Sequence, residues 1–591
     1  MAQRAAEQTP KATATTWQPY LQPKTFSLIG GDFVNETLIS YHKDKEGNTS
    51  GSCNGTIENG IVKPALRGMD IPKVDFGTYM RDSWLQYGDK TAVVDDMSGE
   101  SCTFSELDRQ CRSVAAGMLS LGFKPGDVAA FISTNTLDLV VALFGAIFAG
   151  AKVTFIKTNL TGREVGNLFK KLRPTMVFCD SDNTEKVREQ RETLTSVKAF
   201  VSFDECDDMV SLATLKNHPD QIQRPVPRDP EDVLFIFFTS GTTGHPKPAL
   251  ITHRNYVAIM FGFKSEDSMF HEVSVYLALL PMAHPMGVLV SSTLLIFGAK
   301  TITLRTMAID RLLAAAQKYK NVMLLLYPTY VRYLTEAPVP RTLDLSEVRA
   351  ILIGGSTTPT KHLKELSLMF PRANVVCGYG LTEVVAAAAY CRRPCKDATC
   401  VGPPVPDVEM KVVDVTTNEI LGPRECGEIC IRGPTVFKAY MDMPEATAKA
   451  FDEDGFFCTG DTGYYTEEGH FHVAGRIKDI IKCMDQQVAP AELETLLLSH
   501  PDVREVVVAG VPHPKFGEAA RAFVVLRDGT SQDEATKKSL EAYIEGLVAN
   551  YKQLHGGIEF LDKLPVTDTG KALRREVCEA YLKRIAAATS N

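Results

Sequence analysis

The segment at residues 233–255, VLFIFFTSGTTGHPKPALITHRN, constrains the fold of this chain more than any other. It begins with a continuous apolar run, residues 233–238, which is typical of a strand buried on both faces, as in a parallel sheet. The run leads into Thr239, Ser240, Gly241, Thr242, Thr243 and Gly244. Glycines let a backbone approach a ligand closely, and the hydroxyl and amide donors between them suit phosphate oxygens. Lys247 adds a positive charge and Thr252 is placed to cap a following helix, so the segment predicts a phosphate-binding loop.

Two other interpretations fit a segment of this composition. A turn rich in glycine and threonine is most often only a turn. A Walker-type loop needs the pattern G-x-x-x-x-G-K-[ST], and no GK[ST] closes this stretch. The segment instead resembles the phosphate loop of the adenylate-forming (ANL) superfamily, in particular acyl-CoA synthetases of the 4-coumarate–CoA ligase and firefly luciferase-like kind. Pro248 stands where that loop has its last glycine.

Length and composition limit the class of protein. At 591 residues the chain is too long for one ordinary core, so at least two domains are expected. With 44% hydrophobic and 23% charged residues it has a globular composition. Its net charge of −8 argues against a nucleic-acid partner, which needs a basic patch. The 14 cysteines show neither C-x-x-C pairs nor His/Cys ligand spacing, so the sequence indicates neither a disulfide framework nor a zinc site.

The sequence shows no targeting signal that we recognise. The N-terminal residues lack the apolar region of a secretory signal, and the longest apolar run, residues 139–151, is too short to span a bilayer. The chain ends in Thr589, Ser590 and Asn591 rather than in an SKL-type peroxisomal address. We therefore expect a cytoplasmic protein without a transmembrane segment, a peroxisomal location being left open, and either a monomer or a homodimer.

The order of strand and helix patterns predicts an α/β fold. From Ile61 onward the two patterns alternate, which is typical of βαβ units, and Thr103 with Glu106 forms a capping box at one helix start. From about Cys395 short alternating strands predominate, and a small α+β unit follows Arg476. We expect a large N-terminal domain of two α/β subdomains plus a β-rich subdomain, followed by a small mobile α+β C-terminal domain. The expected boundaries are a poorly ordered extension at 1–60, an AMP-binding adenylation domain at 61–476 and a C-terminal lid at 477–591.

Further segments resemble the same family, in the family's own order. PMAHPMG places His284 just after a strand end, where the family has a histidine near the reacting carboxylate; a buried structural histidine is the alternative. Gly354, Gly355 and Ser356 follow the apolar strand RAILI, and strand ends are where α/β sheets bind ligands. In the family this turn lines the adenine, whereas a Gly-Gly turn taken alone usually only connects two secondary-structure elements.

Two further motifs supply candidate contacts to a nucleotide base, to a metal ion and to ribose. The motif CGYGLTE contains Gly378, Tyr379, Gly380, Thr382 and Glu383. Tyr379 can stack on a base, the glycines allow close approach, and Glu383 offers a hard oxygen ligand to Mg²⁺. The motif FFCTGDTG supplies Asp461, because an acidic residue suits vicinal ribose hydroxyls, although an isolated TGD is more often a surface turn.

The segment GRIKDIIKCMDQQ joins the expected large and small domains. By resemblance, Arg476 helps to hold the ribose, Lys478 is the hinge residue and Lys482 acts in the second half-reaction. Met484 and Asp485 lie where the family has residues along the pantetheine path, and Asp485 is bulkier and anionic. This departure therefore bears on the geometry of CoA binding and not on adenylation.

The motif LPVTDTGKALRRE contains Lys571, directly after Gly570. An arbitrary lysine is nearly always a solvated surface charge. This loop, however, resembles the family's own, which implies that Lys571 brings one ammonium group to the reacting carboxylate and the α-phosphate. The candidate catalytic residues are thus Lys571, His284, Lys482 and Thr382.

The resemblance implies an ATP-dependent acid–CoA ligase that uses ATP, Mg²⁺ and CoA. It would activate a carboxylic acid as acyl-AMP and transfer the acyl group to CoA, releasing AMP and pyrophosphate. Apolar candidates for the acid pocket are Pro285, Met286, Val288, Val384 and Val385. They suit an aryl or a medium-to-long acyl group, so both fatty acid and phenylpropanoid metabolism stay open. A luciferase-like monooxygenase, or an adenylate-forming or nucleotide-binding protein without CoA transfer, is the alternative.

Overall fold

The computed structural model describes residues 55–239, 247–265, 269–306, 308–337, 343–391, 399–484, 486–567 and 572–589. Most of the expected N-terminal extension, the loop residues Ser240 to Gly244, and Lys571 lie outside these ranges. Strand β1 (Thr56–Glu58) forms within the last residues of the expected extension, so regular structure begins before the predicted boundary at residue 60. Among the described residues, none of the helices has the length and apolar character that a membrane span requires.

The first of two α/β sheets has the strand order β21-β11-β10-β6-β5-β7-β8-β9. Its strands are β5 (Val128–Ile132), β6 (Lys152–Phe155), β7 (Met176–Cys179), β8 (Ala199–Ser202), β9 (Val210–Ser211), β10 (Val233–Thr239), β11 (Lys247–Thr252) and β21 (Ala439–Tyr440). The predicted strand β10 is parallel to β6 on one side. On the other side it is antiparallel to β11, which differs from the expected parallel setting. The reason is the short connection after Thr239, since a parallel crossover needs about a dozen residues or more.

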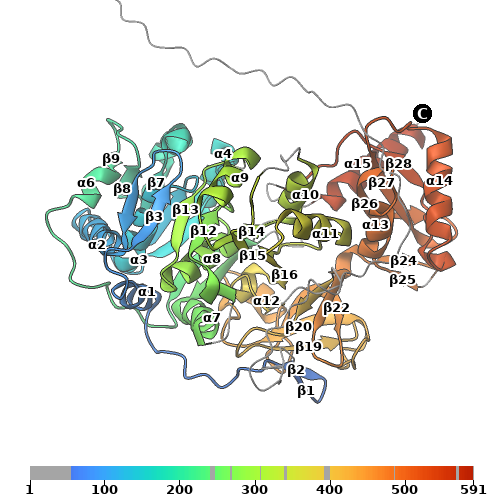
Figure 1. Cartoon of the computed structure of the whole chain (residues 1–591), viewed down its shortest axis with the longest axis horizontal. Helices are drawn as coiled ribbons and strands as arrows, with labels where there is room; N and C mark the ends of the chain where they lie inside the picture. Colours follow the sequence, from blue (N-terminus) through green and yellow to red (C-terminus); the bar gives the residue numbers. More distant parts are fainter. Residues whose placement is uncertain are drawn as a thin grey trace, which may run out of the picture. The chain divides into compact units, whose positions relative to one another are not determined.

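The second α/β sheet has the order β17-β16-β15-β14-β12-β13-β3-β4. Its strands are β3 (Thr91–Asp95), β4 (Ser101–Thr103), β12 (Val275–Ala278), β13 (Lys300–Thr303), β14 (Val322–Leu326), β15 (Val348–Ile353), β16 (Asn374–Tyr379) and β17 (Ala389–Tyr390). Strands β12 to β16, green to olive in Figure 1, are parallel. Strand β3 precedes every strand of the first sheet in the sequence, yet it pairs with β13. The two sheets are therefore built from interleaved segments and not from consecutive halves.

The described ranges contain fifteen α-helices, several of which begin at a side-chain N-cap. They are α1 (Phe76–Trp84), α2 (Phe104–Ser120), α3 (Leu137–Phe148), α4 (Gly162–Leu172), α5 (Thr184–Arg188), α6 (Leu212–Lys216), α7 (His253–Ser265), α8 (Pro285–Ile296), α9 (Ile309–Lys318), α10 (Pro328–Glu336), α11 (Thr360–Met369), α12 (Pro444–Ala448), α13 (Pro490–Leu498), α14 (Glu534–Glu545) and α15 (Arg574–Thr589). The capping box of Thr103 and Glu106 opens α2, as predicted. The Thr252 hydroxyl accepts from the Asn255 N–H at 3.1 Å and so caps α7, also as predicted.

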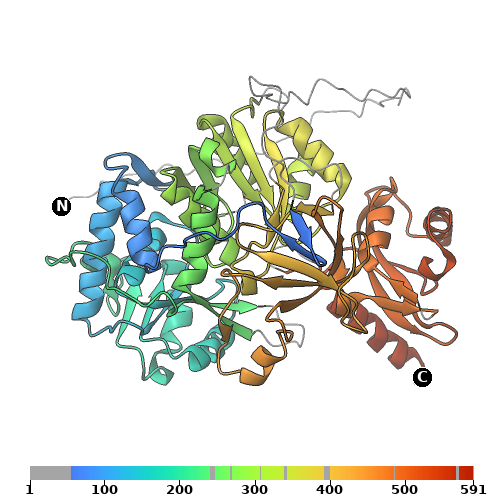
Figure 2. The same cartoon turned by 90° about the horizontal axis from the view of Figure 1, so that it is seen from below.

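A third, antiparallel sheet follows the order β1-β2-β19-β20-β22-β23-β18. Its strands after β1 are β2 (Ile61–Lys63), β18 (Cys400–Gly402), β19 (Glu409–Val413), β20 (Gly427–Arg432), β22 (Phe457–Tyr465) and β23 (Phe471–Arg476). Figure 2 shows the blue pair β1–β2 alongside the orange strands, where β2 pairs with β19. This sheet is the β-rich part that the short alternating strands predict.

The last part of the chain forms a fourth sheet with its own apolar core. The sheet contains β24 (Ile481–Cys483), β25 (Gln486–Val488), β26 (Val503–His513), β27 (Gly517–Leu526) and β28 (Ile558–Phe560), and it is coloured orange to red in Figure 1. Helices α13 and α14 cover a cluster that includes Leu493, Val508 and Leu540. A large α/β part followed by a smaller α+β part confirms the predicted fold class, while the boundaries at residues 60 and 476 stay predictions.

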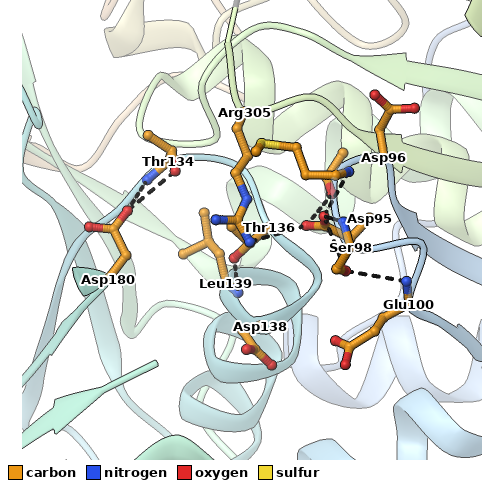
Figure 3. A network of polar contacts seen from close by, with 12 residues as sticks. Asp95, Asp96, Ser98, Glu100, Thr134, Thr136, Asp138, Leu139, Asp180 and Arg305 are labelled. Atoms are coloured by element: carbon orange, nitrogen blue, oxygen red, sulfur yellow. Dashed lines mark hydrogen bonds and ion pairs between the residues drawn. The ribbon is translucent and has the colours of Figure 1, made fainter. Parts of the chain in front are cut away.

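Polar contacts hold the carboxyl ends of the strands in both α/β sheets (Figure 3). After β7, Asp180 accepts hydrogen bonds from the Thr134 N–H at 2.9 Å and from its hydroxyl at 3.2 Å. In the second sheet, the Asp95 carboxylate accepts from the Thr303 hydroxyl at 3.2 Å and lies 3.8 Å from the Arg305 guanidinium. These ends are therefore fixed on the side of the sheets where α/β proteins bind ligands.

Asn135 joins the two sheets directly. Its side chain is 3% exposed, and its amide nitrogen donates to the carbonyl oxygens of Ala278 at 2.9 Å and Leu280 at 2.8 Å. Its amide oxygen accepts from the Met282 N–H at 2.8 Å. One side chain after β5 thus satisfies three backbone groups after β12, in the segment that leads to His284.

We predict that Asn135→Ala destabilises the protein, because it leaves those buried backbone groups without partners. The expected loss is about 2–4 kcal/mol, seen as a lower Tm in a thermal unfolding scan. Asn159→Ala, at an exposed position on the same side of the first sheet, is the matched control and leaves Tm unchanged. Equal Tm values for the two variants would show that Asn135 does not join the sheets energetically.

Candidate active site

The predicted site residues converge on one cavity of about 770 Å³. Those that line it are Thr239, Lys247, His284, Gly354, Gly355, Ser356, Gly378, Gly380, Thr382, Glu383 and Arg476. A second cavity of about 280 Å³ shares Gly355, Gly378 and Arg476 with the first and adds Tyr379 and Asp461. Residues that are more than two hundred positions apart in the sequence therefore meet at one place.

Both ends of the predicted phosphate loop lie at the main cavity. Thr239, at the end of β10, faces Lys247, at the start of β11, across the antiparallel pair. The Lys247 ammonium lies 4.9 Å from the centre of the Tyr440 ring, a cation–π contact that holds this charge at the cavity wall. Residues Ser240 to Gly244 lie outside the described part of the chain, so their predicted phosphate contacts stay a prediction.

Glu383 lies on a buried 3₁₀ turn, Thr382–Val384, and is 8% exposed. Its Oε1 accepts a hydrogen bond from the Tyr440 hydroxyl at 2.8 Å. Burial raises the pKa of Glu383, and the hydrogen bond from Tyr440 opposes that rise by favouring the charged form. Gly380 is needed beside this turn, because a Cβ there would lie 2.1 Å from the Ala386 carbonyl oxygen.

Asp461 projects from an irregularity in β22, where the pairing with β20 shifts between Glu428 and Cys430. Its carboxylate, in a residue 4% exposed, accepts from the Tyr379 hydroxyl at 2.7 Å and lies 2.6 Å from Nε of Arg476. Burial, and secondly the charge of Asp461, hold the pKa of Tyr379 well above its usual range, so the phenol stays a proton donor. Stacking of Tyr379 on a base stays a prediction.

His284 has a structural role and also faces the cavity. It is the N-cap residue of α8, where Nδ1 accepts from the Met286 N–H at 3.4 Å. Its ring meets the Tyr327 ring edge-to-face at 5.5 Å between centres. His284 and Tyr327 line the main cavity and also a further cavity of about 250 Å³ that contains Lys157 and Arg305. The two interpretations given for this histidine are therefore compatible.

The candidate lysines of the C-terminal part lie in different settings. Lys478 lies on the 3₁₀ turn Ile477–Asp479, and burial lowers its pKa. Lys482 is exposed on β24 and lines neither of the two adjoining cavities. Lys571 is outside the described residues, but Ala572, the next residue, lines the second cavity. The structure thus brings Ala572 and Arg476 to one cavity and leaves Lys482 away from it.

The five expected acid-pocket residues divide between the main cavity and the apolar core. Pro285 and Met286 line the main cavity, as expected. Val288, Val384 and Val385 are at most 1% exposed and belong to the apolar core, so their assignment to the pocket stays a prediction. Adjacent apolar side chains cannot be divided between core and pocket without knowing which way the turn at Thr382–Val384 faces.

Sequence reasoning also missed cavity residues, among them Tyr327, Glu428 and Tyr440, which lie outside the motifs, and Cys458, which lies within the motif FFCTGDTG. Tyr440 lies on the edge strand β21. This strand pairs with β11, which is far from it in the sequence, so local patterns do not predict the position of Tyr440. The one available signal was a tyrosine and a carboxylate within strand-like segments, which is too common to be informative.

The sequence matches two family models, one described as AMP-binding enzyme over residues 80–441 and one as AMP-binding enzyme C-terminal domain over residues 492–571. The luciferin 4-monooxygenase of Nipponoluciola cruciata is 31% identical over 526 residues, which are 86% of this chain and 95% of that protein. The 4-coumarate–CoA ligase 2 of Petroselinum crispum is 30% identical over 538 residues, 89% of this chain and 98% of that protein.

Solved structures show the same likeness. The crystal structure of ATP-bound MatB from Rhodopseudomonas palustris aligns with a TM-score of 0.77 at 26% identity, over 85% of this chain and 99% of that chain. The first family model covers more than half of the chain, and its segments meet at the main cavity. The chain therefore belongs to the AMP-binding enzyme family: it is an ATP-using, adenylate-forming enzyme of the superfamily that contains the 4-coumarate–CoA ligases and the luciferases.

Proposed function

We propose that the protein is an ATP-dependent acid–CoA ligase. The observation that carries this proposal is the single cavity that contains Lys247, Glu383 and Arg476 together with the apolar side chain of Met286. Such a cavity offers cationic and hydrogen-bonding groups to a triphosphate beside an apolar wall for an acid. The similar 4-coumarate–CoA ligase, aligned over 89% of this chain, supports the same reaction.

The reaction proposed has two steps, because a carboxylate oxygen is a poor leaving group. In the first, a carboxylate oxygen of the acid attacks the α-phosphorus of ATP, and pyrophosphate leaves, giving acyl-AMP. In the second, the CoA thiol loses its proton and attacks the acyl carbon, and AMP leaves. Both steps pass through crowded anionic states, so catalysis depends mainly on positioning and charge neutralisation.

We assign the cavity residues to the phosphates, the ribose, the base and the Mg²⁺ ion as the sequence predicts. Thr239 and Lys247 would contact phosphates, and the pair Asp461–Arg476 would hold the ribose hydroxyls. Gly355 and Gly378, which line both adjoining cavities, would let the backbone approach the base. Glu383 is a buried carboxylate with the hard oxygen donors that Mg²⁺ prefers, and Mg²⁺ would neutralise charge on the ATP phosphates.

The C-terminal lid would supply different lysines to the two steps. Ala572 lines the second cavity, and Lys571, the residue before it in the sequence, would serve the first step. Lys482 is exposed, and rotation about Lys478, in the turn between β23 and β24, would present it for the second step. The lid boundary at residue 477 is part of this proposal.

A second candidate function is adenylation without efficient CoA transfer. Met484 has a φ of 53°, in the left-handed region that a non-glycine residue rarely adopts. It also lies in the segment where the sequence departs from the family along the expected pantetheine path. A monooxygenase reaction on the same adenylate, as in the luciferin 4-monooxygenase that this chain resembles, is a further outcome to test.

One experiment separates these functions. A panel of aryl, medium-chain and long-chain acids is incubated with ATP and Mg²⁺, with or without CoA, and the products are identified by mass spectrometry. An acyl-CoA that appears only with CoA supports the ligase. Acyl-AMP as the end product supports the second candidate, oxygen consumption with light supports the monooxygenase, and no AMP with any acid contradicts the proposal.

We predict that Lys571→Ala lowers the rate of acyl-AMP formation by on the order of 100-fold or more, because it removes positive charge from the developing anionic centre. Formation of the thioester from supplied acyl-AMP stays close to that of the unchanged protein. Both rates are measured by rapid quench. Lys563→Ala, at an exposed position in the same segment, is the matched control. Equal losses in the two half-reactions would contradict the use of alternating lysines.

We predict that Tyr440→Phe shifts the acid limb of the pH–rate profile for acyl-AMP formation to higher pH. The hydrogen bond from Tyr440 lowers the pKa of Glu383, which burial raises, so removing the hydroxyl raises that pKa further. The ionised form is then lost at a higher pH as the solution is acidified. Tyr333→Phe, on the exposed part of α10, is the control. An unshifted limb would mean that Glu383 is not required in its charged form.

A further inference from the structure

Glu428, Cys430 and Cys458 gather on one face of the third sheet. Glu428 and Cys430 are two residues apart on β20, so their side chains point to the same face. Cys458 is the register partner of Cys430 on the neighbouring strand β22. The sequence does not reveal this pair, because 27 residues separate Cys430 on β20 from Cys458 on β22.

The distances suit a tetrahedral metal ion. The sulfur atoms of Cys430 and Cys458 are 3.7 Å apart, and the two sulfurs and a Glu428 carboxylate oxygen all lie within 4.8 Å of one another. Two zinc–sulfur bonds of about 2.3 Å at a tetrahedral angle place their sulfurs about 3.8 Å apart. The cysteine pair therefore has the required separation already, and the Glu428 carboxylate lies close enough to be the third ligand.

Glu428 is held in a way that suits a metal ligand. Its Oε1 accepts a hydrogen bond from the Gly460 N–H at 2.8 Å, the kind of outer contact that orients a ligating carboxylate. Burial, with a smaller contribution from the nearby Asp461, raises the pKa of Glu428. A cation beside this carboxylate would favour its charged form.

The group is open on one side. Glu428 and Cys458 both line the main cavity, whereas Cys430 is buried behind them. An ion bound by the three side chains would keep its fourth position toward the cavity. Three protein ligands with an open fourth position are typical of accessible zinc sites, in contrast to closed structural ones.

We propose that Glu428, Cys430 and Cys458 form a binding site for a thiophilic divalent cation, Zn²⁺, on the wall of the main cavity. Binding forms two zinc–thiolate bonds and one zinc–carboxylate bond, and the two thiol protons pass to the solvent without any change of oxidation state. Because Thr459, Gly460 and Asp461 follow Cys458 directly, the bound ion alters the wall that positions Asp461. Zn²⁺ therefore acts as an inhibitor of adenylation, a consequence that rests on the proposed function, whereas the binding itself does not.

The test measures binding of the metal alone to the full-length, metal-free protein, kept reduced with a phosphine. Competition with a chromophoric zinc chelator gives the Kd and stoichiometry for Zn²⁺, and Co²⁺ reports thiolate ligation through its charge-transfer absorption. We expect one ion per chain at this site. Cys458→Ser and Cys430→Ser weaken binding by at least about ten-fold and remove the thiolate absorption. Cys458→His, which replaces the sulfur ligand with an imidazole nitrogen, retains part of the affinity.

Cys391→Ser is the matched control, because the sulfurs of Cys391 and Cys400 are also 3.7 Å apart. In the described ranges, no third histidine, cysteine or carboxylate completes a ligand group around that pair. Glu428→Gln provides a variant that retains an acceptor for Gly460, and it lowers affinity while circular dichroism stays unchanged. The proposal is overturned if Cys458→Ser binds Zn²⁺ as the unchanged protein does, or if Cys391→Ser is the variant that loses the metal.

Discussion

The buried carboxylate of Asp461 is the constraint on which the rest of the site depends. A charge removed from water is costly unless hydrogen bonds and an opposite charge surround it. The Tyr379 hydroxyl and the Arg476 guanidinium meet this need at 2.7 Å and 2.6 Å. Tyr379 ends β16 of the second sheet, whereas Asp461 and Arg476 lie on β22 and β23 of the third. The interaction thus fixes the edges of two sheets against each other and shapes the boundary between the two adjoining cavities.

A second carboxylate–phenol pair, Glu383 with Tyr440, lines the main cavity. Glu383 follows the second sheet, and its partner Tyr440 lies on β21, which pairs with β11 of the first sheet. Neither pair is a favourable way to build a core, since apolar residues of similar volume pack at lower free-energy cost. Their presence makes sense if the cavity must offer charge to a ligand, and the cation–π contact of Lys247 with Tyr440 extends the network toward the loop after β10.

Local sequence patterns predicted many of the strands, helix caps and site motifs. The features that they did not predict depend on pairing between segments far apart in the sequence. The strand at β10, the capping box at Thr103 and the cap at Thr252 follow from short segments whose chemistry is decided by neighbours in the sequence. The position of β3 in the second sheet does not, because strand order depends on contacts across two hundred residues. For the same reason the sequence revealed Asp461, Tyr379 and Glu383 through their motifs, but neither the pairing of Tyr379 with Asp461 nor Tyr440, the partner of Glu383. It also gave no sign of the cysteine pair across β20 and β22, nor that Val384 belongs to the apolar core.

The proposed reaction requires this cavity to bring a carboxylate to the α-phosphorus of ATP. The most direct measurement follows the oxygen atoms of an acid substrate whose carboxylate is labelled with heavy oxygen, in a single turnover with ATP and CoA. Attack by that carboxylate followed by thiolysis predicts that one labelled oxygen appears in AMP and none in pyrophosphate. Label in a phosphate or pyrophosphate product, or AMP without label alongside a consumed acid, would contradict the account.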